Sequence, residues 1–418
     1  MKILLAFLFI FLATPTLAEE YDSTFINSSN ISYEFKANPG KVLALDQYVK
    51  KWLKENNTYS LATEIHYTPS PCENNQFAED YNYPTFSVGL RYSFNHATMM
   101  HRDADPAWGQ LEPVDYNCYL GDILTLYGTF SRPVFRSSKW ELAYFLGGGI
   151  GYSHKKYNKT DQIDNEFIGS HLNIFFTAGI SATYYIAPHW GLKGGIDFSH
   201  HSNGALYRPN KGINYLGPFL GTVYFPSSDR SRQAQRGKYP TKFQKSLFAE
   251  FSLGIGAKTL LEDWQQTQFN TPPDNSEYRT DHFHIYTAYS FQADILYRYA
   301  RRWASGIGID VFYGTYSDHI RDLDHANGYS ERHSPWSVGL AAKHETFYKS
   351  LSVRVGLGYY LFRQMGHSAK EIEKPYYERV GLHYSFPKLG NLSFGFNVNA
   401  HLTKADFTEL QISYPIKL

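Results

Sequence analysis

Long stretches of the chain alternate apolar and polar residues with a period of two. Leu247, Ala249, Phe251, Leu253, Ile255 and Ala257 occupy every second position of Ser246–Ala257, and the same pattern runs through Leu351–Leu361 and Asn391–Leu402. These segments have 11 or 12 residues, whereas strands of soluble proteins usually have about 5–6 and tilted membrane-crossing strands about 9–11. The pattern therefore favours strands that cross a bilayer over those of a soluble sandwich.

One face of each strand is apolar and the other carries Arg, Glu, Asn, His and Gly, which is typical of outer membrane barrels. A sheet in a bilayer has to close, because its edges would leave main-chain groups unpaired. The predicted fold class is all-β, a transmembrane antiparallel β-barrel of 14–16 strands with a short N-terminal helix. About 15 strands can be counted from residue 59 onward, and bacterial barrels have even numbers. A strand at Asn30–Lys36 would make 16, and fusing two segments would make 14.

The basic stretch Pro226–Lys242 (PSSDRSRQAQRGKYPTK) separates the two halves of the strand pattern. It is interpreted as a loop. Two small barrels joined by this loop remain an alternative, but one large barrel requires fewer special assumptions.

Residues 41–54 (KVLALDQYVKKWLK) are the one segment with a helical period. Val42, Leu45, Val49, Trp52 and Leu53 fall on one face and lysines on the other, which predicts a helix. Packing on its own protein is favoured over lying on a membrane surface.

The N-terminus has Lys2, an apolar run from Ile3 to Leu12, and small residues before Ala18, as in a secretory signal. The run is too short for a membrane anchor. The expected organisation is a signal peptide at 1–18, an N-terminal segment at 19–56, barrel at 57–225 that carries the site, the basic loop at 226–242, and the remainder of the barrel at 243–418.

Composition excludes several function classes. Aromatic residues make up 17% of the chain, and the formal net charge is +1, so no nucleic-acid partner is expected. No metal motif is convincing, since His282 and His284 are more simply interpreted as rim residues. No phosphate-binding glycine loop is present either, so neither a metal nor another cofactor is expected. The bonding of the only cysteines, Cys72 and Cys118, cannot be inferred from their spacing.

The stretch 198–214 (FSHHSNGALYRPNKGIN) ends one such strand with polar residues. His200 and Ser202 continue the apolar register of Trp190, Leu192, Ile196 and Phe198, so both are expected on the lipid-facing side. Two residues on one strand face are about 6.5–7 Å apart, which allows an imidazole to approach a hydroxyl. A polar turn at the membrane rim would have a similar composition.

The spacing of Phe198, His200, Ser202, Asn203, Asn210 and position 214 resembles the signature of PagL-type lipid A 3-O-deacylases. Residues 140–225 resemble this family more loosely. The whole chain is similar to its longer acyloxyacyl hydrolase-like members from Bacteroidetes, including Lys343-His344-Glu345 and the terminal HLTKADFTEL. The resemblance implies a bacterial outer membrane location and a serine esterase that acts on lipid A of lipopolysaccharide. Ser202 would be the nucleophile, His200 the base, and Asn203 and Asn210 the oxyanion donors.

One position departs from the family pattern, because the acidic residue expected at 214 is Asn214. An amide can orient an imidazole but cannot stabilise its charge, and such an exchange costs about 10⁴ in rate in serine proteases. Another carboxylate could serve instead, with Glu345 ranked before Glu409 and Asp197.

The predicted function is therefore an outer membrane esterase that removes an ester-linked acyl chain from lipid A or a related glycolipid. Two rivals are a non-catalytic porin and a catalytically silent lipid-binding barrel. A homodimer is one of the oligomeric states that the sequence leaves open.

Overall fold

The computed structural model describes residues 30–70, 75–108, 114–227, 243–402 and 404–418. The expected signal peptide, Cys72 and most of the basic loop lie outside these ranges. The chain divides into two compact units. The first contains the described residues up to Asn203 and from Pro209 to 227, and the second contains Gly204–Arg208 and the described residues from 243 onward.

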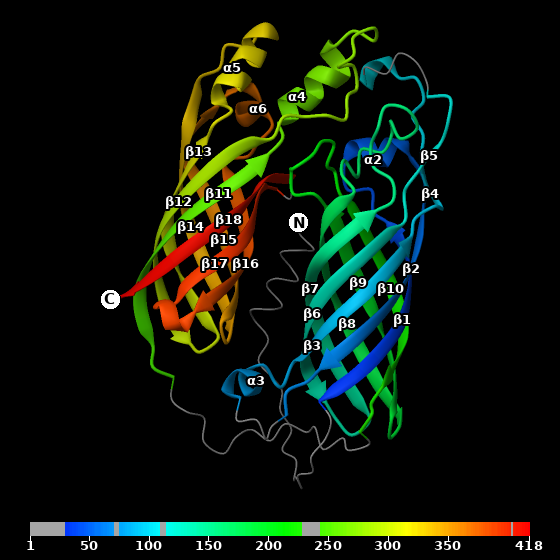
Figure 1. Cartoon of the computed structure of the whole chain (residues 1–418), viewed down its shortest axis with the longest axis vertical. Helices are drawn as coiled ribbons and strands as arrows, with labels where there is room; N and C mark the ends of the chain where they lie inside the picture. The colour runs from blue at the N-terminus through cyan, green and yellow to red at the C-terminus, as the bar shows by residue number, and fades with distance from the viewer. Residues whose placement is uncertain (1–29, 71–74, 109–113, 228–242, 403) are drawn as a thin grey trace. The chain divides into compact units, whose positions relative to one another are not determined.

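The described residues of the first unit form a closed antiparallel barrel of eight strands (Figure 1). Each strand pairs with the next, and β1 pairs with both β10 and β2, which closes the cylinder. The strands are β1 (Ile31–Val42), β2 (Leu53–Tyr67), β3 (Thr85–Phe94), β6 (Ile123–Arg136), β7 (Trp140–Ser153), β8 (Leu172–Ala187), β9 (Trp190–Ser202) and β10 (Ile213–Tyr224). The short strand β4 (Thr98–Met100) pairs with the first residues of β2, and β5 (Cys118–Tyr119) pairs with β4.

The second unit, over its own described residues, is also a closed barrel of eight antiparallel strands, in which β11 pairs with β18. The strands are β11 (Ser246–Lys258), β12 (Tyr286–Ala300), β13 (Trp303–Gly314), β14 (His333–Tyr348), β15 (Leu351–Met365), β16 (Tyr376–Phe386), β17 (Leu392–His401) and β18 (Lys404–Lys417). Its connections carry α4 (Leu261–Gln265), η3 (Gln266–Asn270), α5 (Ser317–Ala326), α6 (Gly366–Glu371) and η4 (Pro387–Leu389).

The structure confirms the all-β antiparallel barrel class and corrects the expectation of one large barrel. The strand predicted at Asn30–Lys36 exists as part of β1, and in the part of the chain that the structure describes the strands of the two closed barrels total 16, eight in each. The sequence pattern does not distinguish one large barrel from two small ones, because the alternation of apolar and polar residues is the same in both. What divides the chain is the hydrogen bonding of β1 to β10, a pairing between segments far apart in sequence.

Alternation places apolar side chains outside both barrels and polar ones inside. In β11, Leu253 and Ile255 are 59% and 54% exposed, whereas Glu250 and Ser252 are buried. A closed sheet with an apolar outer wall satisfies its main chain internally and presents hydrocarbon to lipid. The outer membrane location predicted from the sequence is consistent with this wall.

The predicted helix over 41–54 is shorter in the structure. β1 continues to Val42 and β2 begins at Leu53, so that only Gln47–Trp52 forms α2. Asp46 caps the helix by accepting a hydrogen bond from the Val49 amide at 2.8 Å. The helix packs on its own protein, since Tyr48, Val49 and Trp52 are buried. Among the described residues, no helix has both the length and the apolar composition needed to cross a membrane.

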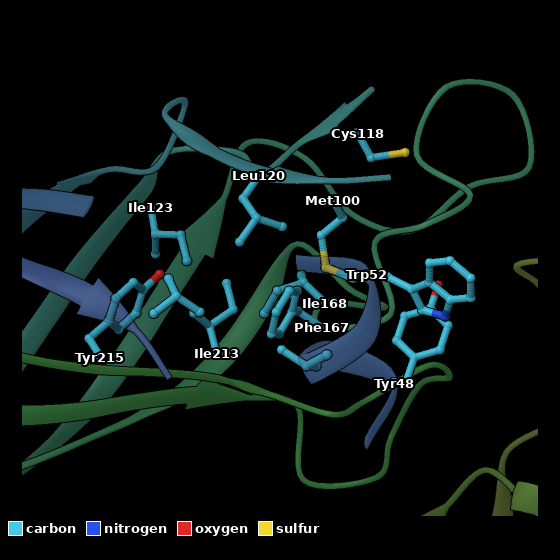
Figure 2. Packing of buried hydrophobic residues seen from close by; sticks show 12 residues of the cluster. Tyr48, Trp52, Met100, Cys118, Leu120, Ile123, Phe167, Ile168, Ile213 and Tyr215 are labelled. Carbon is cyan, nitrogen blue, oxygen red and sulfur yellow. The ribbon is translucent and has the colours of Figure 1, made fainter. Parts of the chain in front are cut away.

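One end of the first barrel is sealed by a hydrophobic cluster drawn from α2, strand ends and long loops. Ile213 and Tyr215 of β10 lie at one end of this cluster, Tyr48 and Trp52 at the other, and Phe167 and Ile168 between them (Figure 2). The connections at this end include residues 95–108, 114–122 and 154–171, whereas two turns at the opposite end span only 137–139 and 188–189. Outer membrane barrels have long extracellular loops and short periplasmic turns, so the sealed end is the extracellular one.

The direction of β9 follows from its place in the strand order of the first barrel. β9 is the seventh strand of its barrel and therefore runs in the same direction as β1. Residues 198–202 thus lie at the extracellular end, where lipid A fills the outer leaflet.

Candidate active site

His200 and Asn214 are hydrogen bonded at the extracellular end of the first barrel. Nδ1 of His200 lies 2.8 Å from Oδ1 of Asn214. The two residues face one another across the β9–β10 pair, since Asn214 is the register partner of His200. The amide oxygen accepts the Nδ1 proton, so that Nε2 keeps the free lone pair of a base.

Both side chains belong to the outward register because their chain neighbours are anchored inside. His201 bonds to Thr125 at 3.0 Å through Nε2 and packs against Phe175 and Tyr215 within the barrel. Ile213 and Tyr215, on either side of Asn214, are buried in the hydrophobic cluster. Since successive strand residues point to opposite faces, His200 and Asn214 are turned to the outer wall.

Ser202 shares this outward register and pairs with Ile174 of β8. It ends β9 two residues beyond His200, a separation of about 6.5–7 Å along the strand. The structure thus brings His200 and Asn214 into contact and puts Ser202 next along the same face.

Gly212, just before β10, leaves room for the imidazole ring of His200. Its φ is +71°, and a Cβ there would lie 2.5 Å from Cε1 of His200. The Gly212 amide donates to the carbonyl of Phe167 at 3.0 Å, which ties it to the β7–β8 loop. A glycine is therefore required by both conformation and space.

The two candidate oxyanion donors contact one another. The main-chain amide of Asn203 donates to Oδ1 of Asn210 at 3.0 Å. This bond closes the base of the β9–β10 loop and commits the Asn210 oxygen, which leaves Nδ2 as the donor of that side chain.

The tip of the same loop, Gly204–Arg208, belongs to the second unit by its contacts. The carbonyl of Ala205 accepts from the amide of Thr259 at 2.8 Å and from its hydroxyl at 3.0 Å. Arg208 donates through Nη2 to the carbonyl of Thr259 at 3.0 Å. No pattern in the sequence indicated these contacts.

The carboxylates considered as a third catalytic residue all point into barrel interiors. Glu345 accepts from Arg354 Nε at 2.9 Å inside the second barrel. Asp197 accepts from Arg91 at 2.7 Å inside the first barrel, and Glu409 pairs with Arg379 in the second. Each carboxylate balances an arginine in a lumen, and the residue that contacts His200 in the structure is Asn214.

Glu166 and Lys211 form an ion pair next to the site that the sequence analysis did not identify. Lys211 Nζ lies 3.3 Å from Glu166 Oε2 and 3.5 Å from Asp46 Oδ2. Burial raises the pKa of the Glu166 carboxyl, although the nearby Lys211 ammonium acts in the opposite direction. The Lys211 amide also donates to the Glu166 carbonyl at 3.1 Å. The one signal in the sequence for this ion pair is that Lys211 lies between Asn210 and Gly212.

Two groups of potential metal ligands occur among the described residues, and neither contains a residue of the candidate site. One consists of Glu34, Glu64 and His66, and the other of Glu373, His401 and Asp406. In the first group, Glu34 pairs with Lys193 at 2.7 Å and Glu64 with Lys36. These ammonium groups balance the charges of the two carboxylates, so the group belongs to the ion-pair network of the lumen.

The fold and these residues define a class of protein: a membrane-embedded barrel with a polar site on its lipid-facing wall. Residues 78–222 match the family model described as lipid A 3-O-deacylase (PagL), and residues 247–418 match that described as acyloxyacyl hydrolase, C-terminal domain. The first barrel thus matches the PagL lipid A 3-O-deacylase family from β3 to β10, and the second barrel matches the acyloxyacyl hydrolase C-terminal domain. This confirms the resemblance inferred from the sequence.

Solved structures are similar only at low identity. The outer membrane enzyme PagL has 14% identity and a TM-score of 0.29, covering 45% of this chain and 97% of its own. The FrpB iron transporter of Neisseria meningitidis has 10% identity and a TM-score of 0.22, covering 92% of this chain and 68% of its own. An outer membrane channel from Pseudomonas putida F1 has 8% identity and a TM-score of 0.19, covering 96% of this chain and 100% of its own. No curated protein matches the chain. The family assignment therefore rests on the family models.

Proposed function

We propose that the protein is an outer membrane esterase that removes an ester-linked acyl chain from lipid A or a related glycolipid. The observation that carries the proposal is the 2.8 Å contact of His200 Nδ1 with Asn214 Oδ1 on the outer wall. Ser202 lies two residues beyond His200 on the same strand face. The membership of residues 78–222 in a lipid A 3-O-deacylase family supports the substrate class.

In the proposed mechanism, Ser202 Oγ attacks the carbonyl carbon of the ester while His200 Nε2 takes its proton. The tetrahedral oxyanion is stabilised by the Nδ2 group of Asn210 and by the side-chain amide of Asn203. The bond between the carbonyl carbon and the sugar oxygen breaks, and the sugar oxygen leaves with the proton held by His200. Water then attacks the acyl-serine with the same base, which releases the fatty acid and restores the Ser202 hydroxyl. No cofactor is needed for these steps.

The location on the outer wall suits this substrate. An acyl chain can stay among hydrocarbon tails while its ester reaches the extracellular rim, where His200 lies. A soluble active site would have to extract the entire chain from the bilayer, at about 0.8 kcal/mol per CH₂ group.

The porin alternative is disfavoured by the lumens of both barrels. An eight-stranded barrel is only wide enough for its own side chains, whereas porins use 16–18 strands. Ion pairs occupy these lumens, including Arg91–Asp197 in the first barrel and Arg354–Glu250 in the second.

The test is the mass of lipid A from cells that express the wild type or Ser202→Ala. We expect the wild type to lower the mass by one acyl group and the variant to leave it unchanged, because removal of a nucleophilic serine costs on the order of 10⁶-fold in rate in a serine protease. Ser199→Ala is the matched control, because Ser199 is on the same strand but buried on the inner face. Equal deacylation by wild type and Ser202→Ala would overturn the mechanism, and no deacylation by the wild type would favour a silent lipid-binding barrel.

A further inference from the structure

A second serine–histidine pair lies on the outer wall of the second barrel. Ser305 Oγ is 2.8 Å from His344 Nδ1, and the two residues are register partners across β13 and β14. Ser305 shares its register with Ile307, which is 62% exposed. The chain neighbours of His344 point inward, where Lys343 bonds to Asp310 and Glu345 to Arg354. The pair therefore faces lipid.

Polar side chains on a lipid-facing wall are costly and need an explanation. The contact between Ser305 and His344 satisfies one nitrogen of the imidazole. The other, Nε2, is buried and has no hydrogen-bond partner among the described residues. With its proton on Nε2, the ring presents the lone pair of Nδ1 to the serine hydroxyl, as a general base requires.

The residues around the pair indicate a position near the ester groups of a membrane leaflet. Ser305 comes just after the short turn between β12 and β13, and Tyr297 is its partner on β12, exposed on the outer wall. Exposed Tyr and Trp mark the boundary between hydrocarbon and headgroups, which is where lipid esters lie. The turn beyond carries Arg301 and Arg302, and the Arg302 guanidinium is 4.2 Å from the ring centroid of Trp303. Arginine side chains at this level are suited to bind the phosphate of a lipid headgroup.

We propose that Ser305 and His344 form a second ester-hydrolysing site, whose substrates are glycerophospholipids at the periplasmic face of the membrane. The short turns of an outer membrane barrel are periplasmic, and glycerophospholipids occupy that leaflet. This activity is separate from the one proposed for Ser202.

The chemistry needs only water. Ser305 Oγ attacks the ester carbonyl carbon while His344 Nδ1 takes its proton, and the tetrahedral intermediate expels the glycerol oxygen, which leaves with that proton as a lysophospholipid. Water then attacks the acyl-serine with the same base, releasing the fatty acid and restoring the hydroxyl. Because no carboxylate of the described residues accepts a hydrogen bond from the imidazole, turnover is slow.

The experiment uses the full chain carrying Ser202→Ala, reconstituted in phosphatidylglycerol vesicles, with lysophospholipid and fatty acid measured by mass spectrometry. We expect release, and a loss of at least tenfold when either Ser305→Ala or His344→Asn is added. Ser350→Ala, in the β14–β15 turn at the same end of the barrel, is the matched control and should keep the rate. Heat-modifiable migration on gels shows that each variant has formed its barrels.

A fluorophosphonate probe gives an independent measurement. The peptide that contains Ser305 should be labelled in the Ser202→Ala protein, and the label should be lost when His344→Asn is added. Absence of fatty acid release, or equal release and labelling with and without His344, would overturn the proposal. Neither result bears on lipid A deacylation, because all measurements lack Ser202.

Discussion

His200 and Asn214 lie 14 residues apart in the sequence and 2.8 Å apart in the structure, joined through Nδ1 and Oδ1. The partner of the imidazole is thus a neutral amide. It fixes the orientation and tautomer of the ring, but it adds no negative charge to stabilise the imidazolium that forms during ester cleavage.

Asn214→Asp should therefore raise the rate of lipid A deacylation. The exchange keeps the oxygen that contacts Nδ1 and adds the missing charge, and the reverse change in serine proteases costs about 10⁴ in rate. We expect an increase of at least tenfold, measured as lipid A converted per unit time in detergent micelles. Asn214→Leu, which removes the contact, should lower the rate. If the Asn214→Asp variant were no faster than the wild type, ring orientation alone would limit the base.

Gly212→Ala should inactivate the site while leaving the barrel folded. The added Cβ would lie 2.5 Å from Cε1 of His200, and a displacement of about 1 Å in an active site can cost 10²-fold in rate. Gly328→Ala is the control for backbone strain, since Gly328 has a φ of +81° and no described atom within 4 Å of an added Cβ. Similar activity in the two variants would contradict the supporting role of Gly212.

Glu166→Gln should change the dependence of stability on pH. Burial raises the pKa of the Glu166 carboxyl, so folding favours its protonated form. The wild type should then lose stability relative to the glutamine variant as pH rises from about 4.5, the ordinary value, through the raised pKa. Thermal unfolding of both proteins between pH 4 and pH 8 measures this difference. A difference that stays constant, or that grows in favour of the wild type with rising pH, would contradict the predicted sign.

Removing one partner of the Arg91–Asp197 pair should destabilise the first barrel. Asp197 is buried and accepts from Arg91 at 2.7 Å and from Thr177 at 2.6 Å. Asp197→Ala leaves a buried guanidinium without its partner, which costs about 3–5 kcal/mol. Urea unfolding of each single variant and of the double variant with Arg91→Ala measures the coupling. The double variant should lose less than the sum of the single losses, and simple additivity would exclude a direct pairing.

Most strands could be predicted because the signal is local. Alternation of Leu247 to Ala257 specifies which side chains face lipid, and β11 follows it from Ser246 to Lys258. The same reliance on local pattern makes the predicted helix too long. Val42 and Leu53 fit a helical face, but they belong to β1 and β2. Hydrogen bonding of these residues to other strands outweighed their local pattern.

The sequence by itself determined that the chain forms long strands with one apolar face, and that His200 and Ser202 share that face, because both properties depend on a period of two along a single segment. Only the tertiary structure decided that the strands close as two barrels of eight, and that Asn214 rather than a carboxylate touches His200. Closure and cross-strand contact are set by hydrogen bonding between distant segments, and an alternating pattern is the same whichever strand becomes the neighbour.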